Sequence, residues 1–492
     1  MKTRRSFLKC LALLPLATSA TFAWAQQKAW QWVNDVHSKL NRTRVAEILE
    51  PSNHSEAARI VQQAAQKGQN ISICGGRHAM GTQQFGTDTQ LIDTRQLTRV
   101  LSLDTTSGIV EVESGIQWPE LISELHKRQK SYPQPWTIAQ KQTGADRLTV
   151  GGALAANAHS RGLTMRPIIS DVESFQIINA AGETKECSRS QNSELFSLAI
   201  GGYGLFGLIT TVKLRLMRRQ KLERKVEFLN IAQVMPNFDA AIGSGALYGD
   251  FQFSIDPHSE NFLQEGVFST YHSVDPLIPI PEDNLRLDPS SWDQLLRLAH
   301  TDKAGAFQLY KDFYLKTDGQ LYWSDEHQMS YYSDDYHQRI NSHLDCQHQG
   351  SEMITEIYVP RDHLTDFMAE ASKYLRESEA DVIYGTVRLI DRDEESYLSW
   401  AKQSYACIIF NLHVTHTEAA IEKAAAAFRG LIDLAIKSDG SYYLTYHKWA
   451  KKSQLESCYP QFNTFMEMKR SYDPSEVFQS DWYRHNRDLL NS

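Results

Sequence analysis

Long apolar runs, paired cysteines and phosphate-loop motifs are all missing from this sequence. After the first 25 residues, no run approaches the ~18 apolar residues that a membrane-spanning helix needs. The six cysteines are scattered and show no C-x-x-C spacing, so we expect neither a disulfide framework nor a metal site. The absence of a G-x-x-x-x-G-K-[ST] motif disfavours the phosphate-loop nucleotidases.

Positive charge is also scarce. The chain has 51 lysines and arginines against 59 aspartates and glutamates, a formal net charge of −8, which disfavours nucleic acid as a partner. By contrast, 41% of its 492 residues are hydrophobic and 10% are aromatic, and no repeat or low-complexity bias is present. This composition excludes a disordered or fibrous chain and predicts more than one packed unit.

The N-terminus has the three parts of a secretory signal. Arg4 and Arg5 precede Ser-Phe-Leu-Lys, a short apolar run follows at 10–17, and Ala23-Trp-Ala25 offers a small-x-small cleavage site. The paired arginines resemble the twin-arginine signal, whose passengers fold before export. We therefore expect residues 1–25 to be removed after Ala25 and the mature protein to be exported, for example to the periplasm, by the twin-arginine export machinery.

Hydrophobic periodicity divides the mature chain into two units and a closing segment. In the N-terminal unit, residues 40–219, the pattern predicts helices at 51–68 and from Pro119, and strands at 70–74, 91–93, 100–103, 109–113, 172–179, 184–187 and 208–216. In the cap unit, residues 220–437, it predicts strands at 352–359, 381–390 and 405–414 and helices at 364–375 and 421–432, while 245–350 has no readable pattern. This order favours an antiparallel sheet with helices on one face. The closing segment, residues 438–492, is too short to fold alone and is expected to pack on the N-terminal unit.

Three glycine clusters lie in the N-terminal unit, at 75–81, 143–153 and 201–207. Glycine lets backbone N–H groups approach an anionic ligand closely, so such clusters suit a phosphate-bearing cofactor. Gly202-x-Gly204-x-x-Gly207 matches the dinucleotide fingerprint, but a helix precedes it and a strand follows, which is the reverse of the Rossmann order.

These clusters, with Leu148–His159 and Asp171–Phe175, resemble the FAD-binding domain of the vanillyl-alcohol oxidase and p-cresol methylhydroxylase (PCMH-type) superfamily. Tyr459–Phe462 and Arg470–Pro474 resemble the closing segment of the same group. The pattern is most similar to aldonolactone and alditol oxidases and to decaprenylphosphoryl-ribose oxidase. The resemblance implies an α+β fold, with a two-subdomain FAD-binding domain, an antiparallel-sheet substrate domain, and FAD as cofactor.

The resemblance also implies which residues contact FAD. The implied set comprises the first cluster, the second cluster with its helix, and two further positions near the flavin or the adenine: Gly75, Gly76, Arg77, His78, Ala79, Met80, Gly81, Thr143, Gly144, Thr149, Gly151, Gly152, Asn157, His159 and Ile209. In alditol and aldonolactone oxidases, the Gly-x-Arg-His pattern carries the histidine that is joined to the flavin 8α-methyl. His78 fits that pattern, whereas the decaprenylphosphoryl-ribose oxidases hold FAD noncovalently, so both readings stay open.

A catalytic group must share or take the hydroxyl proton of the donor. By resemblance, the stretch 440–448 corresponds to a segment with an active-site lysine, and a gapless match puts His447 at that position with Lys448 next to it. We predict His447 as the base, Lys448 as the alternative, and Arg388 as a cation facing the reduced flavin or a substrate oxygen. Weaker candidates for the cavity wall are Asn411, His413, Tyr443 and Trp323.

The function that follows is an exported FAD-dependent oxidoreductase. It would oxidise a CH–OH group of a sugar, polyol or aldonolactone-like small molecule and pass electrons to oxygen or a quinone. The alternative is a flavin-retaining binding protein without turnover, which is suggested by the missing lysine.

Overall fold

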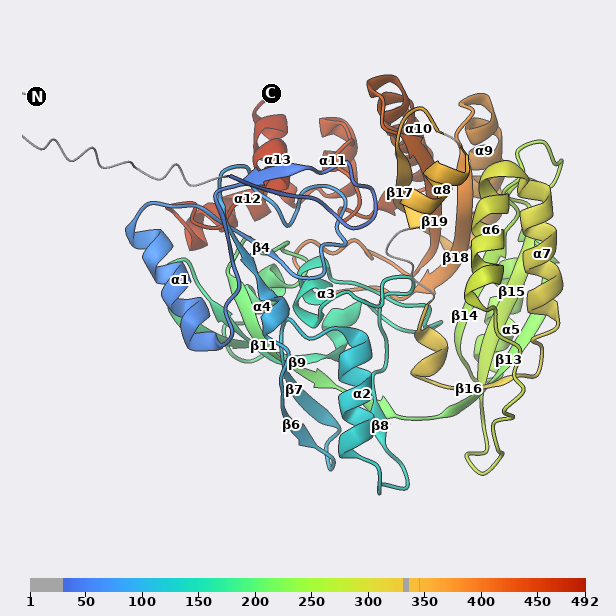
Figure 1. Cartoon of the computed structure of the whole chain (residues 1–492), viewed down its shortest axis with the longest axis horizontal. Coiled ribbons are helices and arrows are strands. Elements are labelled where there is room, and N and C mark those ends of the chain that lie inside the picture. The colour runs from blue at the N-terminus through green and yellow to red at the C-terminus, as the bar shows by residue number, and fades with distance from the viewer. Residues whose placement is uncertain (1–29, 331–335, 345) are drawn as a thin grey trace, which may run out of the picture.

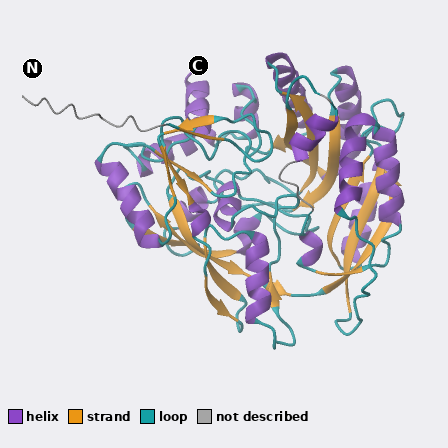
Figure 2. Ribbon diagram, in the orientation of Figure 1, coloured by secondary structure: helices purple, strands orange, loops and turns teal. Residues whose placement is uncertain are grey.

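The computed structural model describes residues 30–330, 336–344 and 346–492 (Figure 1). The predicted signal peptide lies outside the described residues. No helix among the described residues combines the length and the apolar character that crossing a membrane requires. The N-terminal unit and the cap unit lie side by side, and the segments between their sheets are mainly loops (Figure 2).

The N-terminal unit contains two main sheets. A parallel sheet has the order β3-β5-β4, and an antiparallel sheet has the order β10-β9-β11-β7-β6. The strands are β3 (Glu47–Leu49), β4 (Ile71–Cys74), β5 (Gln90–Asp93), β6 (Val100–Asp104), β7 (Ile109–Glu113), β9 (Val172–Ile178), β10 (Thr184–Ser188) and β11 (Leu208–Arg215). The predicted strands of this unit, including the hairpin of β9 and β10, are therefore confirmed.

Helices cover these sheets. The main ones are α1 (His54–Gln66), α2 (Trp118–Arg128), α3 (Val150–Ala156) and α4 (Ser193–Ala199). Helix α1 begins at the predicted cap, since the Asn53 side chain accepts a hydrogen bond from the Glu56 backbone N–H. Its buried stripe of Ala57, Ile60, Val61 and Ala64 is the face that the sequence predicted.

The cap unit is built on one eight-stranded sheet with the order β16-β13-β15-β14-β18-β19-β17-β20. Its strands are β13 (Lys221–Asn230), β14 (Ala246–Phe253), β15 (Glu265–Val274), β16 (Leu321–Trp323), β17 (Gly350–Pro360), β18 (Val382–Ile390), β19 (Tyr405–Thr415) and β20 (Ser441–Tyr442). All pairings assigned between these strands are antiparallel, which confirms the expected sheet.

The sequence predicted helices on one face of this sheet, and the structure has helices on both faces. Paired residues on neighbouring antiparallel strands point to the same face, and Phe268 of β15 pairs with Glu227, the neighbour of Phe228 on β13. Phe268 and Phe228 therefore point to opposite faces. Phe268 packs on Phe238 of α5 (Ile231–Gly243), and Phe228 packs on Phe307 of α7 (Lys303–Leu315). Helices α5, α9 (Leu364–Glu377) and α10 (Glu418–Lys437) back the sheet, while α6 (Pro289–Thr301) and α7, in the stretch without a readable pattern, cover part of its other face.

The closing segment carries α11 (Lys452–Cys458), α12 (Phe462–Tyr472) and α13 (Asp481–Asn491). The Ile71 N–H donates to the Val477 carbonyl at 2.6 Å, beside the parallel sheet. Trp482 lies 4.9 Å from Tyr203, measured between ring centroids. These contacts attach the last part of the chain to the N-terminal unit, near the third glycine cluster.

Candidate active site

A cavity of about 580 Å³ lies between the N-terminal unit and the cap unit. Its volume is in the range of small-molecule and cofactor sites, about 300–1,000 Å³. All three glycine clusters reach its wall, through Gly75, Gly76, Gly144, Gly151, Gly152, Gly204 and Gly207. Strands β13, β14, β15, β18 and β19 and helices α6 and α7 supply the opposite wall.

The first cluster forms a turn where β4 ends at Cys74. Arg77 adopts a φ of 61°, and its guanidinium donates to the buried carboxylate of Asp93 at 2.8 Å. Burial acts to raise the pKa of Asp93, but hydrogen bonds from Arg95 and the charges of both arginines leave that pKa below its ordinary value. Asp93 therefore stays ionised and fixes the turn that carries His78.

The glycine loops fit a cofactor that is held by backbone groups. A Cβ at Gly75 would lie 2.1 Å from Thr149 Oγ1, and a Cβ at Gly76 would lie 2.3 Å from the Arg147 carbonyl oxygen, so the loops pack without room for side chains. At Gly144, with a φ of 80°, no atom comes within 4 Å of the Cβ position, although the residue lines the cavity. A side chain there would occupy space that the cavity leaves to a ligand. This arrangement suits the diphosphate of FAD.

Most of the residues predicted to contact FAD line this cavity. They are Gly75, Gly76, Arg77, His78, Ala79, Met80, Thr143, Gly144, Gly151, Gly152 and Ile209. The lining does not include the remaining four, Gly81, Thr149, Asn157 and His159. Thr149 caps α3 by accepting from the Gly152 N–H, and Asn157 ends α3 in the left-handed conformation with its amide bonded to Asp393. These two residues support the loops from behind.

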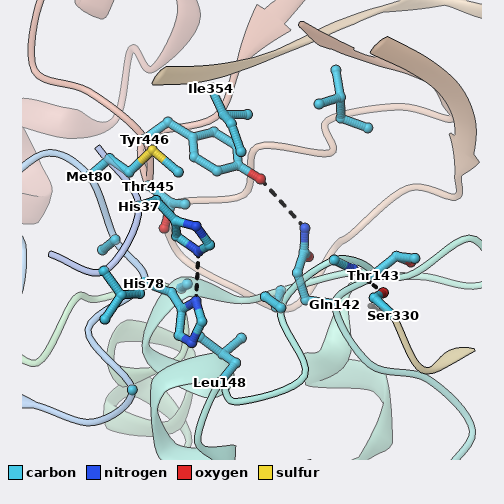
Figure 3. A pocket seen from close by; sticks show the side chains of 18 of the residues that line it. His37, His78, Met80, Gln142, Thr143, Leu148, Ser330, Ile354, Thr445 and Tyr446 are labelled. Carbon is cyan, nitrogen blue, oxygen red and sulfur yellow. Dashed lines mark hydrogen bonds between the residues drawn. The ribbon is translucent and has the colours of Figure 1, made fainter. Parts of the chain in front are cut away.

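His78 lies on the cavity wall against a second histidine. Its Nδ1 is 2.7 Å from Nε2 of His37 (Figure 3). Burial and the neighbouring His37 hold the pKa of His78 well below its ordinary value. The imidazole is therefore neutral at physiological pH, which is the form that can act as a nucleophile or hydrogen-bond acceptor.

Tyr446 is one of the polar residues of the closing segment that line the cavity. Its hydroxyl lies 3.3 Å from a carboxylate oxygen of the fully buried Glu356, and 3.5 Å from Gln142 Nε2 (Figure 3). The second oxygen of Glu356 pairs with Nε2 of buried His159, whose Nδ1 faces the Ser160 carbonyl. Burial and the Glu356 charge raise the pKa of Tyr446 well above its ordinary value. A protonated phenol thus connects the cavity to a buried carboxylate and imidazole.

The residues predicted to supply the base lie elsewhere. His447 is buried against the rings of Phe428 and Trp449, and its Nε2 bonds to Thr355 Oγ1 at 3.1 Å. Neither His447 nor Lys448 lines the cavity, so the role predicted for them has no support there. The physical reason is that β20 ends at Tyr442, and a strand-like alternation cannot be continued to residue 447.

Of the five other predicted cavity residues, three line the cavity and two do not. Arg388 of β18 lines the cavity and is buried, and its Nε has no hydrogen-bond partner among the described residues. Asn411 and Tyr443 also line it, whereas His413 and Trp323 do not. Tyr446 and Glu356 were not predicted from the sequence, although Glu356, a carboxylate directly before the apolar residues 357–359 of β17, was a usable signal.

The packing of His447 makes a prediction about acid stability. Burial, with a smaller effect from the Arg429 charge, lowers the pKa of His447 to about 3. Between pH 3 and pH 6.5 the unfolded chain binds a proton that the folded state does not, so the free energy of unfolding should fall as the pH falls through this window and level off above it. The slope is up to about 1.4 kcal/mol per pH unit from this residue. Thermal melts of His447→Phe should show a flatter pH dependence than the parent, and an unchanged slope would contradict the assignment.

Comparisons with known proteins agree with this geometry. Residues 45–188 match a family model described as FAD binding domain, and residues 308–486 match one described as D-arabinono-1,4-lactone oxidase. L-gulonolactone oxidase from Bos taurus is 28% identical over 214 residues, 43% of this chain and 46% of that protein, so this alignment spans about half of the bovine protein. L-gulono-1,4-lactone dehydrogenase from Mycobacterium tuberculosis is 21% identical over 442 residues, 89% of this chain and 95% of that protein.

The fold, the glycine-lined cavity and these matches define a PCMH-type flavoprotein with FAD as cofactor. Within that class, the chain is similar to aldonolactone oxidases and dehydrogenases, and the matches indicate an FAD-linked oxidoreductase. The two family models match opposite sides of the cavity, the first on the N-terminal unit and the second on the cap unit and closing segment.

Proposed function

We propose that this protein oxidises a CH–OH group of an aldonolactone or a closely related sugar, and passes the electrons to oxygen or a quinone. The observation that carries the proposal is the position of Tyr446, whose hydroxyl opens onto the cavity and is backed by Glu356. The names of the relatives, lactone oxidases and a lactone dehydrogenase, support the substrate class.

Different residues of the chain would bind the cofactor, accept the proton and supply positive charge. The glycine clusters would hold FAD, which when bound supplies the acceptor for the hydride. Tyr446 donates its hydroxyl hydrogen to Glu356, and its oxygen is then left to accept the proton of the substrate hydroxyl. A proton that moves from substrate to Tyr446 is matched by one that moves from Tyr446 to Glu356, so no charge need remain on the phenol. Arg388 supplies a buried positive charge on the cap-unit wall of the cavity, which faces the glycine clusters.

The test is anaerobic reduction of the purified protein. L-gulono-1,4-lactone and D-arabinono-1,4-lactone would be mixed with the enzyme, and the flavin band followed in the visible spectrum. Bleaching by a lactone is expected. A protein that purifies without flavin, or whose flavin is bleached by no lactone, sugar or polyol, would overturn the proposal. The second outcome would favour a flavin-retaining binding protein.

We also propose export of the folded protein by the twin-arginine route, on the basis of Arg4, Arg5 and the apolar run that follows. Cell fractionation should find the shortened chain outside the cytoplasm. The double change Arg4→Lys with Arg5→Lys should retain the full-length chain inside, and equal export of both forms would reject this route.

A further inference from the structure

A group of charged and aromatic side chains lies at the cap end of the cavity, away from the glycine loops. Arg224 of β13 is 9% exposed. Its Nε donates to the Tyr271 hydroxyl at 2.9 Å and its Nη1 to Thr317 Oγ1 at 3.0 Å. The guanidinium also lies over the ring of Tyr314, 5.2 Å from its centroid. Arg224 is thus held rigidly, with neutral hydroxyls as its partners.

The cavity wall carries more cationic than anionic side chains. Four arginines line the cavity, Arg77, Arg161, Arg224 and Arg388, and two of them have a carboxylate within 4 Å. Arg77 pairs with Asp93 and Arg161 with Asp250, at 2.8 and 3.4 Å. Among the residues that the structure describes, neither Arg224 nor Arg388 has a carboxylate at that distance.

The remaining titratable groups do not balance this excess. Glu352, the other carboxylate on the wall, accepts from Asn411 Nδ2 at 2.6 Å. His327 stays neutral, because burial and the charges of Arg161 and Arg224 hold its pKa well below the ordinary value. Tyr310 on α7 keeps its proton, because burial raises its pKa well above the ordinary value. The wall near Arg224 therefore presents positive charge and hydroxyl groups.

An unpaired buried guanidinium is costly, because it loses hydration without gaining an ionic partner. Arg388 lies near the reacting end, since it pairs in register with Cys407, whose Sγ is within 4.8 Å of a Glu356 carboxylate oxygen, and it is available to the flavin or a substrate oxygen. Arg224 lies on β13 at the cap end of the cavity, and the guanidinium groups of Arg224 and Arg161 both contact the ring of Tyr271, at 5.1 and 5.0 Å from its centroid. The Nε of Arg161 is buried and has no hydrogen-bond partner among the described residues.

We infer that Arg224, with Arg161 and the surrounding tyrosine hydroxyls, binds an anionic group of the substrate. The preferred substrate is then a hydroxylated molecule that carries a carboxylate or a phosphate at the end remote from the reacting carbon. Guanidinium groups suit both anions, because their N–H donors match two oxygens at once. This inference rests on the proposed function and narrows its substrate class from neutral lactones to acidic sugars.

Matched pairs of ligands test the inference. Each pair shares its hydroxyl stereochemistry and differs at one end: D-gluconate with D-glucitol, D-galactonate with galactitol, and glucitol 6-phosphate with D-glucitol. Apparent Kd values come from the concentration dependence of anaerobic flavin bleaching, or from the shift of the flavin spectrum where no bleaching occurs. For at least one pair, the anion is expected to bind about 10- to 100-fold more tightly than its neutral partner. The two anion types distinguish a carboxylate site from a phosphate site.

Variants assign the effect to Arg224. Arg224→Met should remove the preference for the anion and leave the Kd of the neutral partner within about twofold, and Arg224→Lys should retain part of it. The matched control is Arg376→Met, because Arg376 is a cap-unit arginine that lies over Phe262 and bonds to loop carbonyls outside the cavity. Flavin content and thermal melts check folding of each variant.

The outcomes separate the two proposals. If neutral lactones or alditols bleach the flavin and no anion binds more tightly than its partner, the anion subsite is wrong and the oxidase function stands. An anion preference that survives in folded Arg224→Met would likewise reject the subsite. If no ligand of either kind bleaches the flavin, the proposed function itself fails.

Discussion

Tyr446→Phe is expected to slow reduction of the bound flavin by about 10²- to 10³-fold while leaving the FAD content unchanged. The variant removes one oxygen, which lies between Gln142 and the buried Glu356 and opens onto the cavity. Proton transfer by a positioned side chain contributes about 10²- to 10⁴-fold to a rate, so loss of the acceptor should appear in the reductive step. Stopped-flow bleaching at saturating lactone measures this step directly.

The matched control for this change is Tyr358→Phe. Tyr358 is a fully buried tyrosine that stacks on Trp400, and its hydroxyl has no hydrogen-bond partner among the described residues. Tyr358 does not line the cavity, so the rate of flavin reduction in the Tyr358→Phe variant should stay within about twofold of the parent rate. If the flavin of Tyr446→Phe is bleached as fast as the flavin of this control, Tyr446 has no role in the reductive step.

Glu356→Gln separates a proton route from simple positioning. The amide keeps the shape of the carboxylate but cannot take a proton from Tyr446, so the reductive rate should fall nearly as far as in Tyr446→Phe. The double variant should be little slower than either single one, because both act through one hydrogen-bonded chain. Fully additive losses would instead mean that the two residues work independently.

Periodicity predicted the regions in which one face of an element meets an apolar core. The stripe of α9, with Leu364, Phe367, Met368, Ala371 and Leu375, is buried against the sheet as expected. Helix α7 could not be read in this way. Its Ala306, Phe307, Tyr310 and Tyr314 recur at helical spacing, but they line the cavity, so this stripe does not meet a closed apolar core.

The glycine clusters were readable because the constraint on them is local. A backbone turn that excludes a Cβ, as at Gly75 and Gly76, requires glycine, and glycine can be recognised in the sequence. Which residue of this segment lines the cavity could not be predicted, because the choice between Tyr446 and His447 depends on one residue of register in a segment without regular structure. Only the packing of His447 against Phe428 and Trp449 decides which of the two neighbours meets the cavity.

The second large effect is expected at His78. If its imidazole is joined to the flavin, acid precipitation of the parent protein should carry the yellow colour with the polypeptide, and His78→Ala should release all of it into the supernatant. His54→Ala is the matched control, since His54 belongs to the same unit, bonds to Thr184 and Thr210, and does not line the cavity. Flavin fluorescence of the denatured band on a gel provides a second readout that does not depend on turnover.

The contact between His37 and His78 allows a second variant to test the attachment of the flavin. A bond from His78 to carbon requires a neutral imidazole with a lone pair, and His37 Nε2, 2.7 Å from His78 Nδ1, can take or hold the proton on that side of the ring. His37→Phe should therefore lower the fraction of acid-stable flavin at early times after FAD is added to the apoprotein, whereas His78→Ala should abolish it at all times. If the parent protein releases its flavin completely in acid, His78 is a noncovalent contact. The same His37→Phe change should then alter only the affinity for FAD.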